Sequence, residues 1–172
     1  VASATYIGNG GTQTVASGGA AQATIVAAGG TEIVSTGGVA SATYVSSGGT
    51  MVFAGGGFVS PTVASGGTKL VATGATVGTS ALTASAGVVL AVRGTTNDAQ
   101  ILSGGTVIIS SGGSAVAPVM HSGGTIVFAG GSVTAIQPDV GITEVVLPGV
   151  SVGGTNVNVW VSGTGTPTGW PC

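Results

Sequence analysis

The sequence contains very little charge. Only 3% of its 172 residues are Asp, Glu, Lys or Arg, whereas about a quarter is usual in globular domains. Two basic side chains, Lys69 and Arg93, cannot neutralise a row of phosphates, which excludes nucleic acid and argues against an anionic membrane surface as partner. Long apolar runs are also missing. The stretch "AGVVLAV" is far shorter than the roughly 20 residues that a transmembrane helix needs, so no transmembrane segment is expected.

Cysteine and the features of a leader peptide are equally scarce. The single cysteine, Cys172, excludes an intrachain disulfide and is either an inert terminal thiol or an interchain link. The first residues lack the basic-then-apolar order of a signal peptide and an initiator Met. These features indicate a processed chain or a piece of a longer one. The opening "VASATYIGNGGT" supports that interpretation, because it nearly repeats Val39–Thr50, "VASATYVSSGGT", and so starts in the middle of a repeat.

Glycine, by contrast, is abundant and regularly placed. The 35 glycines divide the chain into similar repeats of 19 residues, give or take two. Examples are "GTQTVASGGAAQATIVAAG" (11–29), "GTEIVSTGGVASATYVSSG" (30–48) and "GTVIISSGGSAVAPVMHSG" (105–123). A fixed period of this length is typical of repeat architectures, in which each unit packs on the next.

Three positions of the repeat hold similar residues in successive copies. Thr usually follows the opening Gly: Thr12, Thr31, Thr50, Thr68, Thr106 and Thr125, with Val88 in the loosest copy. Three residues later comes an apolar side chain: Val15, Val34, Phe53, Val71, Ala91, Ile109 and Phe128. A second apolar side chain precedes the closing Gly by three positions: Ile7, Val26, Val45, Val63, Ile101 and Met120, with Thr83 in the loosest copy.

Each repeat is predicted to form one strand, a corner, a second strand and a second corner. Short runs of Val, Ile, Thr, Tyr and Phe between Gly-rich clusters favour strands, and paired Gly suits sharp corners. One strand pair cannot bury a face alone, but stacked copies can, because each apolar position then lies over its equivalent. We therefore predict an all-β, single-stranded parallel β-solenoid, right-handed by connection chirality. A β-sandwich or barrel of hairpins is the alternative, which the regular period disfavours.

The predicted organisation has three parts. Residues 1–141 form the β-solenoid repeat array, residues 142–161 a terminal irregular coil with one strand at Asn156–Val161, and residues 162–172 a Gly/Thr/Pro-rich tail. Inside the array, the Thr positions form a Thr ladder near a corner. The positions Val15, Val34, Phe53, Val71, Ile109 and Phe128 form a core ladder.

The motif GGT-x-x-V-x-x-GG-x-A-x-x-T-x-V-x-x-GG resembles the imperfect repeat in passenger domains of AIDA-type autotransporter adhesins. The resemblance covers roughly Val1 to Gly141. It implies a β-helical rod exported to the bacterial surface, where it mediates adhesion, autoaggregation and biofilm formation. It also implies heptose on repeat hydroxyls, with unmodified corner serines as the alternative. The candidate O-glycan acceptors by analogy are Ser17, Ser47, Ser65, Ser103, Ser111 and Ser122. No translocator barrel follows in this sequence.

No catalytic, metal or cofactor site is predicted, so the chain is not expected to be an enzyme. Lyases and hydrolases built on β-helices need clustered carboxylates, whereas Glu32, Asp98, Asp139 and Glu144 fall at different phases of the repeat. His121 is the only histidine and is interpreted as a solvent-facing substitution. Calcium-binding repeats need an Asp in every copy, and zinc needs several His or Cys.

The function expected from the sequence is therefore structural and adhesive, at the cell surface or outside the cell. Self-association is favoured, because charge is the common defence of exposed strand edges and this chain has almost none. A host-cell or polysaccharide surface is the other expected partner. The alternatives are a subunit of an extracellular β-solenoid filament and, less favoured, an ice- or polysaccharide-binding protein that uses the Thr ladder.

Overall fold

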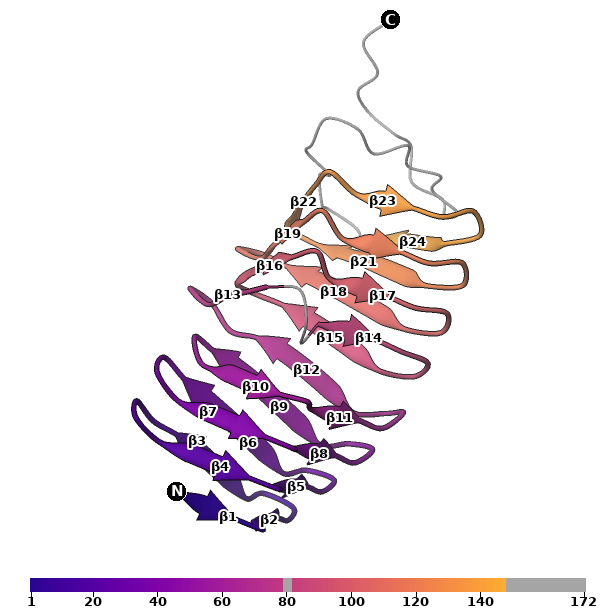
Figure 1. Cartoon of the computed structure of the whole chain (residues 1–172). Helices are drawn as coiled ribbons and strands as arrows, with labels where there is room; N and C mark the ends of the chain where they lie inside the picture. The colour runs from indigo at the N-terminus through magenta and orange to yellow at the C-terminus, as the bar shows by residue number, and fades with distance from the viewer. Residues whose placement is uncertain (79–81, 148–172) are drawn as a thin grey trace, which may run out of the picture.

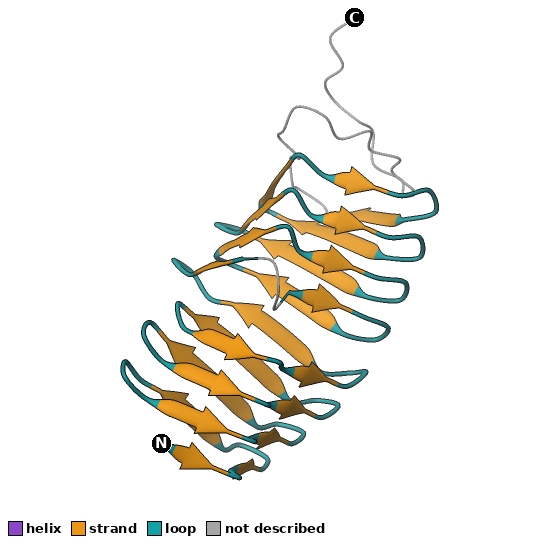
Figure 2. Cartoon of the chain, in the orientation of Figure 1, coloured by secondary structure: helices purple, strands orange, loops and turns teal. Residues whose placement is uncertain are grey.

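The computed structural model describes residues 1–78 and 82–147, and every regular element in them is a β-strand. Successive strands wind round one axis and stack in parallel, which confirms the predicted all-β solenoid (Figure 1). The N-terminus lies at one end of the rod (Figure 2). The predicted strand at Asn156–Val161, the tail and Cys172 lie outside the described residues.

One side of the rod is a continuous sheet, which we call the long sheet. Its eight strands are β3 (Thr12–Val15), β6 (Thr31–Ser35), β9 (Thr50–Ala54), β12 (Thr68–Val71), β15 (Val89–Val92), β18 (Thr106–Ser110), β21 (Thr125–Ala129) and β24 (Thr143–Val146). The coils therefore continue past Gly141. The pairs Thr12 with Thr31, Thr68 with Val89 and Val89 with Thr106 show coils of 19, 21 and 17 residues.

The other side of the rod is divided into four smaller sheets. The middle sheets hold β1 (Ala2–Ser3), β4 (Ala20–Gln22), β7 (Val39–Ser41) and β10 (Gly57–Val59), then β13 (Thr76–Val77), β16 (Thr95–Asn97), β19 (Ser114–Val116) and β22 (Ser132–Thr134). The short sheets hold β2 (Tyr6–Ile7), β5 (Ile25–Val26), β8 (Tyr44–Val45) and β11 (Thr62–Val63), then β14 (Thr83–Ala84), β17 (Gln100–Ile101), β20 (Val119–Met120) and β23 (Gln137–Pro138). In the part of the chain that the structure describes, the long sheet is the only sheet that runs from the coils of β1 to β11 into the coils of β13 to β23.

Each coil has three strands rather than the two predicted. In the second half of the repeat the backbone bends at a residue that is not Gly, for example Ala42 (φ 53°). Its amide donates to the Val59 carbonyl of the next coil at 3.0 Å, and the residue after it, Thr43, is buried. A left-handed Ala is uncommon and carries no sequence signal comparable to Gly, so the bend was not predicted.

A column of glycines forms the corner that leads into the long sheet. Its members are Gly10, Gly29, Gly48, Gly66, Gly87, Gly104, Gly123 and Gly141, all with positive φ. The amide of each donates to the carbonyl of the next at 2.8–3.0 Å, as from Gly104 to Gly123. These bonds satisfy corner amides that would otherwise have no strand partner. The second Gly has a different role: a Cβ on Gly105 would overlap the Ala84 carbonyl oxygen of the preceding coil.

The loosest coil is shifted by one residue from the predicted alignment. The φ of Gly87 identifies it as the first corner Gly, so Val88 takes the place of the second. The register then puts Val89, Val92 and Ala84 in the three columns. The predicted members Val88, Ala91 and Thr83 are therefore wrong by one position, because "AGV" has one Gly where sister corners have two.

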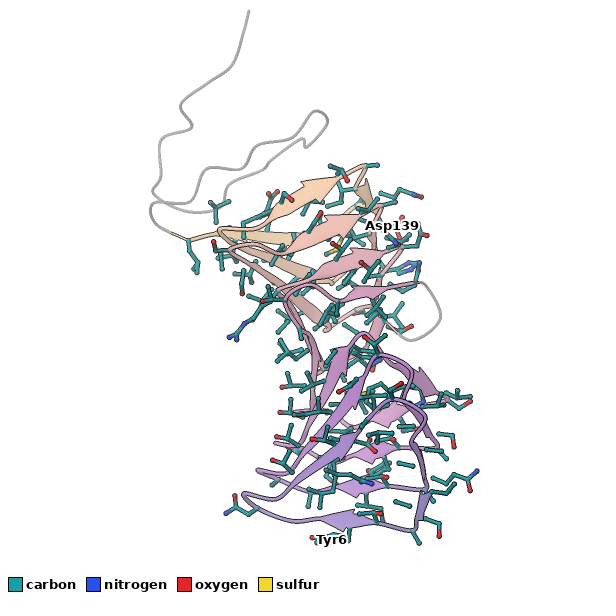
Figure 3. The ribbon with its side chains drawn as sticks, turned by 90° about the vertical axis from the view of Figure 1, so that its left-hand side faces the viewer. Tyr6 and Asp139 are labelled. Carbon is teal, nitrogen blue, oxygen red and sulfur yellow. The ribbon has the colours of Figure 1, made fainter. Side chains whose placement is uncertain are left out.

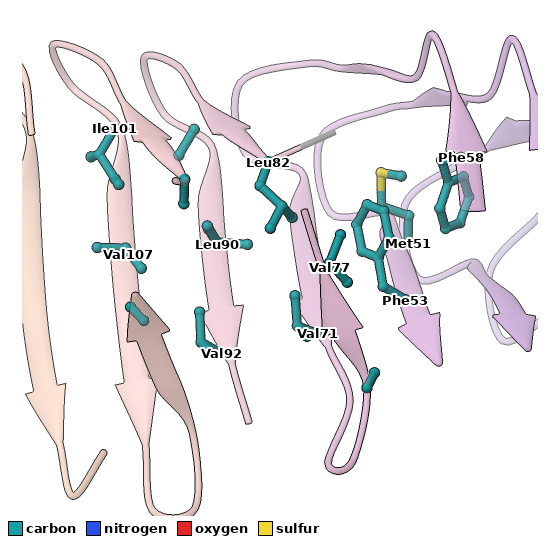
Figure 4. Close-up of a cluster of buried hydrophobic side chains, with 14 of the residues drawn as sticks. Met51, Phe53, Phe58, Val71, Val77, Leu82, Leu90, Val92, Ile101 and Val107 are labelled. Carbon is teal, nitrogen blue, oxygen red and sulfur yellow. The ribbon is translucent and has the colours of Figure 1, made fainter. Parts of the chain in front are cut away.

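The core is a set of apolar columns between the two sides of the rod (Figure 4). Val15, Val34, Phe53, Val71, Ile109 and Phe128 are all buried and paired in register, with Val92 completing the column. Phe53 meets Phe58 of the opposite side edge to face, with ring centroids 4.7 Å apart. Such a contact adds to the burial of both rings.

Candidate functional surface

The outer surface of the first half of the rod carries no Asp, Glu, Lys or Arg. Residues 1–78 contain only two such residues, Glu32 and Lys69, and both are buried inside the solenoid. Asn, Gln, Ser and Thr supply the polar atoms of this surface. Long-range electrostatic attraction to a charged partner therefore has no source here.

Glu32 lies on β6 and its side chain points into the core. Thr43 Oγ1 donates to Glu32 Oε2 at 2.8 Å, while Oε1 has no hydrogen-bond partner. Burial raises the pKa of this carboxyl, and the hydrogen bonds from Thr43 and Thr24 lower it in part. The preceding coil has the same arrangement with an amide, since Gln13 pairs with Glu32 in register and Gln13 Oε1 accepts a 3.4 Å contact from Thr24.

Lys69 lies on β12 in the same inward-facing column, two coils further on. Its Nζ donates to the Thr83 carbonyl oxygen at 2.7 Å. Burial lowers the pKa of the ammonium group to about 8. Its neighbours in the column, Met51 and Leu90, are apolar and also buried.

Two of the four acids share one phase, contrary to the expectation from the sequence. Glu144 on β24 continues the column that contains Glu32, and burial raises its pKa. Five coils of other residues separate the two, so they form no carboxylate pair. Within residues 1–78 and 82–147, no three His, Cys, Asp or Glu residues lie close enough to hold a metal ion. The same residues contain no helix able to cross a membrane.

The candidate acceptor serines all lie exposed at Gly corners. Ser47, Ser65, Ser103 and Ser122 precede members of the glycine column, whereas Ser17 and Ser111 lie at the corner after the long strand. Most of their hydroxyls lie against the Gly of the next coil. Ser17 Oγ would be 2.7 Å from a Cβ on Gly37, and Ser103 Oγ 2.6 Å from one on Gly123. A side chain larger than that of Gly at this position of the next coil would therefore collide with the serine hydroxyl.

The threonines Thr12, Thr31, Thr50, Thr68, Thr106 and Thr125 lie in one column of the long sheet. Val89 interrupts this column between Thr68 and Thr106, and Thr143 extends it. Thr12 and Thr143, at the two ends of the column, are exposed, and the threonines between them are half-buried. The residue two further along each strand points the same way and is usually aliphatic, as at Ile33.

His121 takes part in a polar line across three coils that the sequence did not reveal. Its Nε2 lies 3.1 Å from Gln100 Oε1 and its Nδ1 lies 3.4 Å from Asp139 Oδ2. The side chains of His121 and Asp139 are 40% and 60% exposed, so water screens this contact and it contributes little to stability. The line contains no nucleophile and serves to connect neighbouring coils.

An outward ridge on the short sheet was also missed. Tyr6, Ile25 and Tyr44 pair in register on β2, β5 and β8, and we call them the tyrosine ridge. Their exposed fractions are 69%, 44% and 45%. Figure 3 shows Tyr6 at the first coil and Asp139 near the far end of the rod. The signal was available, because each ridge residue directly precedes a buried member of the column Ile7, Val26 and Val45.

Comparison with known proteins finds a family of adhesin stalks and a structurally similar fragment. Residues 1–49 match the family model "AIDA: Adhesin of bacterial autotransporter system, probable stalk". A crystal structure of a TibC-catalysed hyper-glycosylated TibA55-350 fragment is 32% identical, with a TM-score of 0.66 over 77% of this chain. The chain spans about half (49%) of that fragment. No curated protein matches the chain.

Proposed function

Because the repeats of this chain are AIDA-type autotransporter passenger repeats, we propose that it forms a non-enzymatic shaft that mediates adhesion, autoaggregation or biofilm formation at the bacterial surface. The observation that carries this proposal is the continuous long sheet. Eight parallel strands joined in register make a stiff spacer, and the columns they hold contain no catalytic constellation. Such a rod separates whatever it carries from the cell envelope.

Cell aggregation tests the adhesive function. The chain is displayed on a non-aggregating bacterium, and settling of the culture is followed beside cells that carry the display vehicle alone. We expect faster settling and larger clusters with the chain. Equal settling, together with a purified chain that stays monomeric at high concentration, would remove the support for the proposal.

A self-assembling extracellular filament is the second candidate function. The surface of residues 1–78 without Asp, Glu, Lys or Arg favours it, because no repulsion opposes the approach of another molecule. Electron microscopy of the purified chain separates the two functions. Short single rods support the shaft, whereas long filaments of uniform width support the filament.

We further propose that Ser17, Ser47, Ser65, Ser103, Ser111 and Ser122 are O-glycan acceptors. The similarity to a hyper-glycosylated fragment supports this, as does the exposure of all six serines. Co-expression with a bacterial heptosyltransferase and peptide mass mapping would test it. Added mass confined to other residues, or no added mass, would contradict it.

A further inference from the structure

From the tyrosine ridge and the charge-free surface around it, we infer a binding site for an uncharged polysaccharide on the short-sheet face of the first three coils. This inference rests on the proposed extracellular function, since only an exported rod meets such polymers. It adds a ligand class to that function.

Within residues 1–78 and 82–147, the phenylalanines and the tyrosines lie in different surroundings. Phe53, Phe58 and Phe128 lie in the core. Both tyrosines of the chain lie outside, in the same column. Tyr6 lies on the first described coil, and Tyr44 is 45% exposed although Ile25 and Thr62 flank it on both sides. The ridge therefore exposes aromatic surface that stacking on neighbouring coils does not cover.

Small residues on either side make the ridge stand above its surroundings. Ala4, Ala23, Ala42 and Ser60 precede the column, and Gly8, Ala27, Ser46 and Ala64 follow it. The Tyr6 ring leans along the strand toward Gly8, with Cε1 3.6 Å from the position of a Cβ on that Gly. Apart from this contact, most of the Tyr6 side chain stays open to a ligand, since it is 69% exposed.

The chemistry of this face suits a neutral sugar. The negative face of an aromatic ring attracts the partly positive C–H groups on one face of a pyranose, and Tyr supplies such contact area at low entropic cost. Tyr6 and Tyr44 are two coils apart, about 9.6 Å at the usual strand spacing. An extended β-1,4-linked chain repeats its orientation every second sugar, a length close to that separation. With no Asp, Glu, Lys or Arg exposed on residues 1–78, the side chains of this surface offer no charge to pair with a charged polymer.

The corresponding face of the second half lacks these features. Its outward column is Thr83, Gln100, Val119 and Gln137, without an aromatic ring. His121 and Asp139 lie beside it. The inferred site is therefore confined to the coils of β2, β5 and β8.

Sedimentation with amorphous cellulose, a neutral β-1,4-glucan, tests the inference. The test variant is the whole chain with Tyr6→Thr and Tyr44→Thr, since Thr62 already occupies this column. Loss of two stacking rings is expected to weaken binding about tenfold or more. A Tyr6→Phe and Tyr44→Phe chain should bind within about twofold of the unchanged protein. The matched control is Val39→Thr with Val59→Thr, which removes exposed apolar surface from the adjacent middle sheet and should leave binding unchanged.

Soluble polymers and sedimentation velocity complete the test. Hydroxyethylcellulose should retard the chain in a native gel, and carboxymethylcellulose, with the same backbone but negative charge, should retard it less. No binding to cellulose, or equal binding by the Thr variant, would overturn the inference. So would a Thr variant that changes only self-association, because the ridge would then be a contact between copies. Cells displaying the Thr variant should still aggregate, so failure of the adhesive function is recognised separately.

Discussion

Two ionisable side chains inside the rod dominate its behaviour at the scale of single residues. Glu32 and Lys69 are buried in one column whose other members include Gln13, Met51 and Leu90. Burial removes a charged side chain from water, and this loss of hydration is unfavourable for the charged form of both groups. The column itself therefore suggests which replacements fit, because neighbouring coils place neutral residues in the same surroundings.

Glu32→Gln should raise the free energy of unfolding at pH 7 by about 1 kcal/mol or more. The folded pKa of Glu32 is raised, so the unchanged protein is most stable below the ordinary Glu pKa and loses stability as pH rises toward the folded value. The variant should lack this loss. Urea unfolding between pH 4 and pH 8, read by circular dichroism, measures it. Gln13→Glu, the reverse change one coil away, should destabilise, and equal pH profiles for Glu32→Gln and the unchanged chain would contradict the argument.

Lys69→Met should stabilise the protein at pH 7 and remove its response to alkaline pH. Because burial lowers the folded pKa to about 8, the native state releases the proton before the unfolded state does, and stability rises between about pH 8 and the ordinary Lys pKa near 10.4. Loss of the bond to the Thr83 carbonyl offsets part of the gain. Thermal melts at pH 7 and pH 9.5 test this. A stability that does not rise with pH in the unchanged chain would contradict the assignment.

At the scale of elements, the corners rather than the strands define the coil. The first Gly of a corner needs positive φ. At most corners the second Gly lies where the preceding coil passes too closely for a side chain, as at Gly105, and Val88 is the exception. The glycine column then carries hydrogen bonds along the axis from one corner to the next. Each requirement is local, so single substitutions can separate them.

Gly105→Ala should lower the free energy of unfolding by about 2 kcal/mol or more, because its Cβ would overlap a backbone carbonyl that cannot move without disturbing the coil. Gly57→Ala on β10 is the matched control. It has ordinary φ and no atom within 4 Å of the added Cβ, so it should be neutral or stabilise by up to about 1 kcal/mol. Chemical unfolding of both variants measures the difference. Similar losses for both would show that the close approach at Gly105 has no energetic consequence.

The sequence predicted most elements because period and composition act at every coil. The Gly-rich corners, the parallel stacking and the core ladder from Val15 to Phe128 follow from repetition alone. Features that depend on one position were missed. No glycine indicates the bend at Ala42, and the contact between His121 and Asp139 can be seen only once it is known which residues of neighbouring coils lie side by side. The outward direction of Tyr6 and Tyr44 follows from alternation, because each directly precedes a buried apolar residue, but strands of two residues make this alternation easy to miss.

At the scale of the whole molecule, the long sheet connects the two halves of the rod. The middle and short sheets are each divided between the coil of β10 and β11 and the coil of β13 and β14. Among the sheets of the described residues, the long sheet is the one that passes this point, through the pairing of β12 with β9 and β15. In a stacked array each coil is stabilised by its neighbours, so this is the junction at which cooperativity is weakest.

Leu70→Pro should therefore split unfolding into two transitions. The amides of Thr68 and Ala72 donate to carbonyls of the preceding coil. Leu70 lies between them, on the side of β12 that faces β9, and proline there removes a donor at a cost of about 3 kcal/mol. Val127→Pro makes the same change in β21, where β19 pairs with β22 and β20 with β23 across the same coils. Val127→Pro should lower the midpoint of unfolding, but the protein should still unfold in a single transition.

Hydrogen exchange with mass spectrometry distinguishes these outcomes by location. In the Leu70→Pro chain, peptides before β12 and peptides after it should exchange with two different opening free energies, whereas in the Val127→Pro chain they should remain coupled. One common transition in both variants would mean that the Gly66-to-Gly87 corner bond and the core contacts across the junction join the halves without the long sheet. The rod would then transmit stability through its corners and core as much as through its strands.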